Sequence, residues 1–514
     1  MISKIYSASL KGLSAQIIEI EIALAKGLRS FNIVGLADRA IEEAKERIGA
    51  AIKNIGLSPP RELAKKIVVN LAPADLKKEG SLYDLPIALN YLLVSRQTKF
   101  NPRGKIILGE LALDGTLKPI KGAISFALLA QEKGFPEIIL PKENEKEASL
   151  VGFLKNKEKL KIVGVENLKE ALSYLEGKKE ISSRELKFSD FNNRDTFEIE
   201  FSWIKGQKHA KRALEIAAAG GHNILFQGPP GAGKTLLAKS IISILPKLNL
   251  KELLELAIIY SASGISKKNF PFLIQRPFRS PHHTISEIGL IGGGNPPTPG
   301  EITLSHRGVL FLDEFPEFRR DTLESLRAPL EEGEINIKRA NYNLTFPSRF
   351  TLIAAANPCP CGYFNDPEKE CTCTPSQIVS YRRKLSGPLM DRIDIFCWIP
   401  SLKYNDLISP DREGQSIEVK KRVEKAREIQ KERFKEEMIL TNSEMKIPQI
   451  KKYCQIDSKS QNILRKYVDS ARLSARGYHR VLKVARTIAD LDEKKNISFE
   501  NVSEALIYRL RENN

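Results

Sequence analysis

The segment Asn223–Thr235, which reads NILFQGPPGAGKT, constrains the fold more than any other part of the sequence. Four residues satisfy the spacing G-x-x-x-x-G-K-[ST]: Gly228, Gly233, Lys234 and Thr235. The apolar residues before this loop predict a buried strand, and residues 236–244 after it predict a helix. A glycine-rich loop in this context lets backbone amides surround a phosphate at a helix N-terminus. The motif therefore predicts a parallel α/β fold that binds a nucleoside triphosphate.

The loop residues are assigned as one nucleotide-binding set. They are Gly228, Pro229, Pro230, Gly231, Ala232, Gly233, Lys234 and Thr235. We expect Lys234 to reach the β- and γ-phosphates of ATP and the Thr235 hydroxyl to ligate Mg²⁺. The alternative interpretation is a plain glycine–proline turn. Such a turn needs neither the complete motif nor a strand before it and a helix after it, so the phosphate-binding loop is favoured.

Two further strand ends carry polar groups of the kind that phosphate chemistry needs. Residues 309–314 read VLFLDE, an apolar strand followed by Asp313 and Glu314. Asp313 is expected to hold Mg²⁺, and Glu314 to polarise the attacking water. The alternative is a core strand followed by a pair that caps a helix. The strand predicted at 351–356 ends at Asn357, whose amide would orient the water.

Four segments differ in their patterning. Residues 1–177 combine strand-like runs at 17–22, 67–71 and 137–140 with an amphipathic helix at 40–55, which predicts an α+β domain or an α/β domain with few crossovers. Residues 178–200 are polar and predict a linker. Residues 201–400 alternate strands and helices around glycine- and proline-rich loops, which predicts a parallel α/β core. Residues 401–514 are predicted to be helical.

Charge and composition limit the partners. The 514 residues carry 81 Lys and Arg against 63 Asp and Glu, a net charge of +18 that favours nucleic acid or an acidic membrane surface. The mixed-sign run at 419–438 predicts a solvated helix face rather than a nucleic-acid arm. No apolar run approaches the roughly 18 residues that span a bilayer, and the N-terminus lacks a signal-peptide core. We expect a cytoplasmic protein without a membrane partner.

Several long motifs resemble a single family. They are GQKHAKRALEIAAAGGHNILFQGPPGAGKT from Gly206, RPFRSPHHTIS from Arg276, PGEITLSHRGVLFLDE from Pro299 and AANPCPCG from Ala355. The chain resembles an AAA+ ATPase of the magnesium-chelatase/MCM branch, and within it the ComM/YifB family of magnesium-chelatase-like proteins, over essentially its whole length. This resemblance implies a homo-hexameric ring with ATP bound between subunits, and a helical lid at 401–514.

The resemblance also implies roles for three residues: sensor 1 for Asn357, the arginine finger for Arg392 and sensor 2 for Arg476. The arginine finger would reach the γ-phosphate held by a neighbouring subunit. The alternative for Arg392 is a local salt bridge to Asp391 or Asp394, because such surface pairs are common. Arg382 and Arg383 form a second candidate for the contact in trans.

Two stretches correspond to loops that face the central channel in these relatives. Residues 276–306 match the helix-2 insert, where Gly292–Gly294 and several prolines exclude a regular helix. His282 and His283 lie in this stretch, and we expect local hydrogen bonds rather than a metal. Residues 330–350 match the pre-sensor-1 hairpin, with Lys338 and Arg339 at a tip that would contact DNA phosphates. The competing interpretation of that tip is an ordinary solvated turn.

Four cysteines lie close together in the sequence: Cys359, Cys361, Cys371 and Cys373. Four thiolates can complete the tetrahedral shell of a structural Zn²⁺. Because Cys-x-Cys spacing is less usual for zinc than Cys-x₂-Cys, reduced thiols in a loop beside sensor 1 are the alternative.

The segments at 70–89 and 109–148 resemble the Lon protease domain, which has a ribosomal-S5-like fold. The alignment places Leu82 at the nucleophile position, with Ser81 one residue away, and Ile124 at the catalytic lysine position. Lys121 is three residues from that position. The dyad is therefore missing, which favours a scaffold or DNA-guiding domain over a protease.

The leading hypothesis is an ATP-hydrolysing ring motor acting on single-stranded or branched DNA. The resemblance implies branch migration or helicase activity on recombination intermediates, as in natural transformation. The alternative is a chelatase-type ATPase that remodels a protein partner for metal insertion. Against it, the Lon-like domain is not expected in a chelatase motor subunit.

Overall fold

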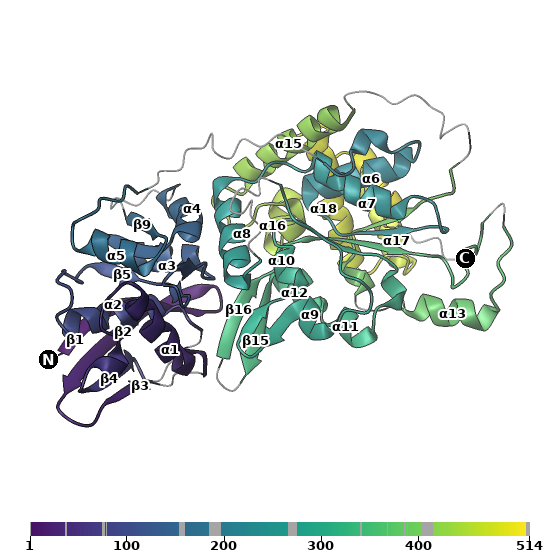
Figure 1. The fold of residues 1–514 in the computed structure, drawn as a ribbon. Helices are drawn as coiled ribbons and strands as arrows, with labels where there is room; N and C mark the ends of the chain where they lie inside the picture. The colour runs from purple at the N-terminus through teal and green to yellow at the C-terminus, as the bar shows by residue number, and fades with distance from the viewer. Residues whose placement is uncertain are drawn as a thin grey trace. The chain divides into compact units, whose positions relative to one another are not determined.

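The structure is a computed structural model, and the chain forms two compact units (Figure 1). The described residues are 2–35, 39–74, 78, 80–153, 160–183, 197–265, 275–339, 342–366, 369–384, 387, 389–402, 404 and 415–509. Residues 184–196 of the expected linker lie outside them. The first unit comprises residues 1–193 together with 250–273, and the second comprises 194–249 together with 274–514.

A mixed seven-stranded sheet, in the order β3-β4-β2-β1-β5-β8-β9, forms the centre of the first unit. Its strands are β1 (Ile2–Lys11), β2 (Ser14–Ala25), β3 (Ser30–Val34), β4 (Lys66–Ala72), β5 (Lys105–Ile107), β8 (Glu137–Pro141) and β9 (Lys161–Val165). β2 pairs antiparallel with both β1 and β4, whereas β5, β8 and β9 are parallel. Along β2 the alternation of isoleucine and glutamate buries Ile18, Ile20 and Ile22. The strands predicted at 17–22, 67–71 and 137–140 are confirmed.

Helices and a short hairpin complete this unit. The helices are α1 (Arg39–Asn54), α2 (Asp84–Val94), α3 (Ala123–Glu132), α4 (Glu145–Ala148), α5 (Leu168–Leu175) and α8 (Leu250–Ser263), and the hairpin is β6 (Glu110–Leu111) with β7 (Leu117–Lys118). α1 confirms the helix predicted at 40–55. α8 comes from within the predicted ATPase core, yet it packs on α3, where Gly122 N donates to Ser261 O at 3.2 Å.

The second unit is built on a five-stranded sheet in the order β11-β14-β17-β10-β18. Its strands are β10 (Ile224–Gln227), β11 (Phe278–Arg279), β14 (Val309–Leu312), β17 (Thr351–Ala356) and β18 (Ile395–Trp398). All neighbouring strands are parallel. The parallel α/β core predicted from the alternating pattern is confirmed. Because the strands run one way, their carboxyl ends lie at one edge and their amino ends at the other.

Helices and two hairpins surround this sheet. The helices are α6 (Lys208–Gly220), α7 (Lys234–Ile244), α9 (Glu287–Ile291), α10 (Glu301–Leu304), α11 (Arg320–Glu324), α12 (Arg327–Glu332), α13 (Pro375–Lys384), α15 (Gln415–Arg433), α16 (Ile447–Tyr453), α17 (Ser458–Asp469), α18 (Ala475–Leu491) and α19 (Phe499–Ile507). The hairpins are β12 (Gly292–Gly294) with β13 (Pro297–Pro299), and β15 (Glu334–Arg339) with β16 (Tyr342–Pro347). Among the described helices, none is long and apolar enough to cross a membrane.

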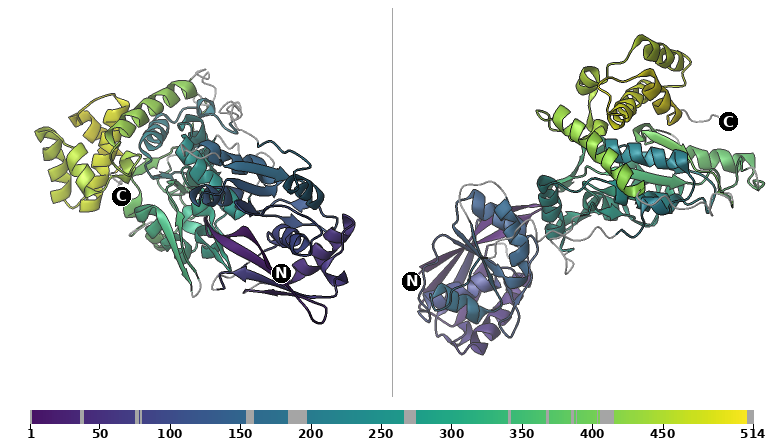
Figure 2. Two further views of the ribbon diagram at one scale, coloured as in Figure 1. Left: turned by 90° about the vertical axis from the view of Figure 1, so that its left-hand side faces the viewer. Right: turned by 90° about the horizontal axis from the view of Figure 1, so that it is seen from above.

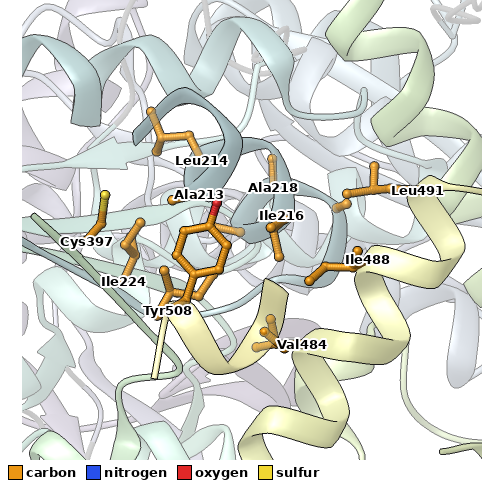
Figure 3. Close-up of a cluster of buried hydrophobic side chains, with 14 of the residues drawn as sticks. Ala213, Leu214, Ile216, Ala218, Ile224, Cys397, Val484, Ile488, Leu491 and Tyr508 are labelled. Carbon is orange, nitrogen blue, oxygen red and sulfur yellow. The ribbon is translucent and has the colours of Figure 1, made fainter. Parts of the chain in front are cut away.

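The C-terminal helices form a lid that shares one hydrophobic core with the sheet. These helices, α15 to α19, are coloured from green to yellow in Figure 2. In Figure 3, Val484 and Ile488 of α18 lie close to Ile216 of α6. Tyr508, which follows α19, belongs to the same core, and its carbonyl accepts from Phe396 N of β18 at 2.7 Å. The lid is therefore attached to the sheet by apolar packing as well as by backbone hydrogen bonds.

The charged run predicted at 419–438 is helical as far as the end of α15 at Arg433. Val419, Val423 and Ala426 are buried, so one side of α15 packs into the core and the mixed charges cover the rest. Arg422 pairs with Glu215 of α6 (2.6 Å), and Lys425 pairs with Glu493 (2.9 Å). These ion pairs join α15 to other elements of the unit.

A buried carboxylate also joins the lid to the sheet. Asp394, just before β18, accepts from Asn223 N at 3.0 Å and pairs with Arg480 of α18. His222 Nδ1 lies 3.5 Å from the same carboxylate. Burial alone would raise the pKa of Asp394, but Arg480 and His222 outweigh it and hold that pKa well below its usual range. The charged form is the one that the fold stabilises.

We predict that Asp394→Asn lowers the free energy of unfolding of the second unit by about 3 kcal/mol at pH 7, because it leaves the Arg480 cation without its partner. A carboxylate with a lowered pKa stabilises the fold above about pH 4, the unfolded-state pKa, and less as the pH falls further. Urea unfolding from pH 7 to pH 3 should show a constant difference between the two proteins down to about pH 4, and a difference that begins to narrow below it. The control is Asp391→Asn, since Asp391 is partly exposed and lies 3.8 Å from Arg476. Equal losses from both variants would contradict the prediction.

Candidate nucleotide site

The loop between β10 and α7 has the backbone that a phosphate-binding loop requires. Gly231 and Gly233 have φ values of +78° and +86°, which favour glycine. A Cβ on Gly228 would come within 2.2 Å of Ile399 O, so that position has no room for a side chain. α7 begins at Lys234, directly after the loop, and its first amides therefore point toward the loop. This geometry fits an anion at the helix N-terminus.

Lys234 lies across this loop. Its Nζ donates to Gly228 O (2.8 Å), to Pro229 O (2.9 Å) and to Asn357 Oδ1 (2.9 Å). Burial lowers the pKa of Lys234 to about 8, against the opposing effect of Asp313. A desolvated ammonium without a close counter-ion gains from an adjacent anion, so this side chain fits a triphosphate. The structure thus brings Lys234 and Asn357 together, as the sequence predicts.

Thr235 and Asp313 meet at the carboxyl-terminal edge of the sheet. Thr235 Oγ1 donates to Asp313 Oδ2 at 2.7 Å, and Asp313 Oδ1 accepts from Glu314 N at 2.9 Å. A hydroxyl and a carboxylate are oxygen donors of the kind that Mg²⁺ prefers. The donor set therefore fits the cation that accompanies a triphosphate.

Glu314 has a partner that sequence analysis missed. Its Oε2 lies 3.1 Å from Nδ1 of His283, and its φ is +49°. We expected His282 and His283 to bond locally. His282 does so with Thr284 Oγ1 at 2.9 Å, but His283 reaches across to Glu314. The order of the strands explains this contact. Because β11 pairs with β14, the segments that follow these two strands begin side by side.

Arg392 and Arg476 lie at the opposite edge of the sheet from the loop. Arg392 O accepts from Asn223 Nδ2 at 3.1 Å, and Asn223 precedes β10, whereas the loop follows β10. Four residues of parallel strand span about 13 Å. Arg392 Nη2 is buried against Glu331 of α12 at 2.6 Å, and Arg476 Nη1 lies 3.8 Å from Asp391. Arg392 thus forms an ion pair with Glu331, a residue that the sequence did not bring to attention.

Of the second pair of arginines, Arg382 lies with its guanidinium 4.6 Å from the ring centre of Phe364, and Arg383 is exposed on α13.

The four cysteines converge in the loop after β17. Cys359 Sγ lies 3.3 Å from Cys361 Sγ and 3.7 Å from Cys371 Sγ, and Cys361 N donates to Cys373 Sγ at 3.3 Å. All four sulfur atoms lie within 4.8 Å of one another. Thiolates about 2.3 Å from a tetrahedral Zn²⁺ would be about 3.8 Å apart, so the cluster has the dimensions of a metal site.

This cysteine loop lies against the phosphate-binding loop. A Cβ on Gly362, which follows Cys361, would come within 2.5 Å of Pro230 Cδ. Asn357, the partner of Lys234, is only two residues before Cys359. Residues on both sides of Cys359 therefore lie at the nucleotide site, with Asn357 before it and Gly362 after it.

The two hairpins of this unit lie side by side. Lys338 and Arg339 are exposed at the end of β15, where Arg339 pairs in register with Tyr342, and the turn between them lies outside the described residues. β13 packs beside β16. The Arg339 guanidinium is 3.7 Å from the position that a Cβ on Gly293 would occupy. The predicted hairpin is confirmed as a structure.

Comparison with known proteins places the whole chain in one group. The family described as "Magnesium chelatase, subunit ChlI" matches residues 200–407, "Subunit ChlI of Mg-chelatase" matches 20–144, and "Magnesium chelatase, subunit ChlI C-terminal" matches 413–509. The sequence analysis used the Lon-like domain as evidence against a chelatase subunit. That argument fails, because a ChlI family also matches residues 20–144.

Full-length relatives narrow the group further. "Competence protein ComM" of Haemophilus influenzae is 41% identical over 98% of this chain and 97% of its own length. "Uncharacterized protein YifB" of Escherichia coli is 42% identical over 99% and 97%. "DNA replication licensing factor Mcm2" of Drosophila melanogaster is 26% identical over 38% of this chain and 20% of its own. The chain therefore belongs to the ComM/YifB family of magnesium-chelatase-like AAA+ ATPases.

Proposed function

We propose that this protein hydrolyses ATP as one subunit of a hexameric ring that remodels DNA, by branch migration or helicase activity on recombination intermediates of natural transformation. Membership of the family implies ATPase activity with ATP and Mg²⁺. The observation that carries the ring is the separation of the site into two edges of one sheet. Phosphate- and cation-binding groups lie at one edge, and Arg392 and Arg476 lie at the other.

Each group at the carboxyl-terminal edge has a defined task in this proposal. The amides of the loop and Lys234 bind the phosphates, and Thr235 with Asp313 holds Mg²⁺, which supplies positive charge beside the phosphates. Glu314 accepts a proton from the attacking water, and Asn357 orients that water. None of these tasks requires a group from the opposite edge.

Arg392 and Arg476 would serve a neighbouring protomer. Within one chain the length of β10 separates them from the loop, so neither can neutralise charge on the nucleotide of its own protomer. In a ring, the amino-terminal edge of one sheet would face the loop of the next. When two protomers assemble, Arg392 would leave Glu331 and contact a phosphate of the nucleotide that the neighbouring protomer binds.

Two variants separate nucleotide binding from hydrolysis. Lys234→Ala should abolish detectable ATP binding, because it removes the only side-chain cation of the loop. Glu314→Gln should bind ATP normally but turn over at least about 100-fold more slowly, the usual contribution of a general base. Equilibrium binding of a fluorescent ATP analogue and steady-state phosphate release measure the two effects. Full turnover by Glu314→Gln would show that another group activates the water.

Three features support DNA as the partner. The chain has a net charge of +18, and Lys338 and Arg339 are exposed at the end of a hairpin. One full-length relative is named a competence protein, and a partial relative is named a DNA replication factor. Cations at a hairpin end contact phosphates without reading base sequence.

We predict that single-stranded or four-way-junction DNA stimulates ATP hydrolysis and that K338A/R339A weakens DNA binding. The slope of log affinity against log salt should fall by about one for each DNA phosphate that the variant no longer neutralises. Fluorescence anisotropy across a salt series measures this slope. The control, K431A/K435A, removes two exposed charges near the end of α15 and should keep the wild-type slope. Absence of DNA binding at low salt would reject DNA as the partner.

The family matches themselves favour a second candidate, a chelatase-type ATPase that remodels a protein partner for metal insertion. It shares the nucleotide chemistry and differs in the partner. Wild-type hydrolysis that is unaffected by every DNA tested would favour this candidate.

The first unit is proposed as a Lon-like scaffold or DNA-guiding domain rather than a protease. Ile124 is fully buried at the position expected for the catalytic lysine. The Ser81 hydroxyl donates to the Glu110 carboxylate. A serine hydroxyl that donates to a carboxylate lacks the arrangement in which a lysine activates it.

The cysteine cluster is proposed to hold a structural Zn²⁺ that stiffens the border of the nucleotide site. Four sulfurs leave no coordination position for substrate, so the metal would have no catalytic role. It would instead fix the loop from Cys359 to Cys373, which places Gly362 against Pro230.

Protein purified without added zinc should contain about one zinc ion per chain, and C371S/C373S should contain none. Without the metal the loop beside Pro230 loosens, so ATP affinity should fall several-fold while the lid remains folded. Metal analysis and ATP titration measure these two effects. Cys454→Ala is the control, because Cys454 is buried in the lid core. A zinc-free wild type with normal ATP binding would contradict the proposal.

A further inference from the structure

One side chain of α13 turns inward, although the helix itself is exposed. In Figure 1, α13 projects beyond the five-stranded sheet of its unit. Val379 on this helix is half exposed, whereas Tyr381 is 6% exposed and is the only buried residue among the ten of α13. A large aromatic ring that is buried alone on an exposed helix anchors that helix at one point. The surroundings of Tyr381 therefore show what α13 is anchored to.

The hydroxyl of Tyr381 lies at the end of β17, in the nucleotide site. The backbone N–H of Asn357, the first residue after β17, donates a hydrogen bond to this hydroxyl. Burial raises the pKa of Tyr381 to about 12, and the negative charge of Glu317 adds to the effect. The phenol therefore keeps its proton near pH 7, and the contact joins two neutral groups.

Asn357 has a second contact, through its side chain. Its Oδ1 accepts from Lys234 Nζ at 2.9 Å. In the proposed mechanism Lys234 contacts the phosphates of ATP, so Asn357 would then lose this partner. The hydrogen bond from the Asn357 backbone to Tyr381 involves no phosphate-binding group and would remain. Tyr381 is thus the contact that can orient Asn357 while nucleotide is bound.

Neighbouring side chains hold the tyrosine in place. Lys384, one turn later on α13, lies with Nζ 3.7 Å from Glu317 Oε2 and 6.0 Å from the centre of the Tyr381 ring. The Glu317 backbone N–H in turn donates to Glu314 O at 2.7 Å. These contacts tie α13 to the segment after β14 as well as to the end of β17.

The cysteine cluster explains how α13 returns to β17. Asn357 lies two residues before Cys359, and α13 begins at Pro375, two residues after Cys373. Cys361 N donates to Cys373 Sγ at 3.3 Å, so the two ends of the cysteine loop meet. The cluster therefore brings the start of α13 to the end of β17, and the hydroxyl of Tyr381 makes a further contact between them.

We propose that Tyr381 is a positioning residue for ATP hydrolysis, which holds the backbone of Asn357 so that the Asn357 amide stays directed at the attacking water. This inference rests on the proposed role of Asn357. It gives α13, for which the sequence indicated only a second candidate pair of arginines, a task in the nucleotide site of its own chain.

Tyr381→Phe is the first test, because it keeps the buried ring and removes only the hydroxyl. It should lower kcat by roughly five- to tenfold, the factor that corresponds to the loss of one hydrogen bond. KM for ATP and the affinity for a fluorescent ATP analogue should stay within about twofold of wild type, since other groups bind the phosphates and Mg²⁺. Steady-state phosphate release and equilibrium binding, with and without single-stranded DNA, measure these effects in the full-length protein.

Tyr453→Phe is the matched control. It also removes one tyrosine hydroxyl that makes a hydrogen bond, in this case to Glu437 Oε1 in the lid at 3.2 Å. It should hydrolyse ATP as the wild type does. Wild-type kcat in Tyr381→Phe, or a loss of ATP affinity as large as the loss of kcat, would overturn the inference.

A double-mutant cycle separates positioning of Asn357 from a merely structural role. In an Asn357→Ala background, Tyr381→Phe should lower kcat no further, because the backbone contact then orients no amide. A second loss of the full factor in that background would show that Tyr381 acts elsewhere, and the inference would fail. Wild-type kcat in Asn357→Ala alone would reject the proposed role of Asn357 together with this inference. A wild-type protein without ATP hydrolysis would reject the proposed function itself.

Discussion

The parallel direction of every strand in the second unit's five-stranded sheet is the constraint on which the site depends. It gathers the amides of the phosphate loop, Lys234, Asp313 and Glu314 at one edge of the sheet, since each follows a strand. It also sends Arg392, which precedes β18, to the other edge. In the proposed mechanism, a single chain thus carries both halves of a phosphate-transfer site without being able to join them. Assembly, in the proposed mechanism, is a consequence of strand polarity.

The backbone-determined parts of this molecule could be predicted from the sequence. The loop at Gly228–Thr235, the strands that end just before Asp313 and Asn357, and the β15–β16 hairpin all follow from local patterns of glycine, apolar and alternating residues. The long-range partners could not. Arg392 bonds to Glu331 and His283 to Glu314, and such choices depend on side chains that tertiary packing brings together. The convergence of the cysteines lies between these cases, because the spacing indicates a cluster but not its contact with Pro230 through Gly362.

The lid is joined to the sheet by two different kinds of interaction. Apolar packing of α18 on α6 is non-directional and tolerates small sliding movements (Figure 3). The pairing of Asp394 with Arg480 is directional and buried, so it fixes where α18 meets β18. Arg476 lies one turn before Arg480 on the same helix, and its position at the amino-terminal edge therefore depends on that pair. The buried Asp394 carboxylate thus helps to fix the position of the exposed Arg476 guanidinium.

The assignment of α8 to the first unit has a consequence for how the molecule can be divided. The chain passes between the units three times, after residues 193, 249 and 273. No single cut can separate two self-sufficient pieces, because a truncation at residue 193 would deprive α8 of its partner α3. A fragment that begins at residue 194 would keep α8, with its buried Leu254, Leu256 and Ile259, but would lack the helix on which α8 packs. A shorter protein would therefore need either a substitute for the α3 surface or the removal of α8 together with the rest of the first unit.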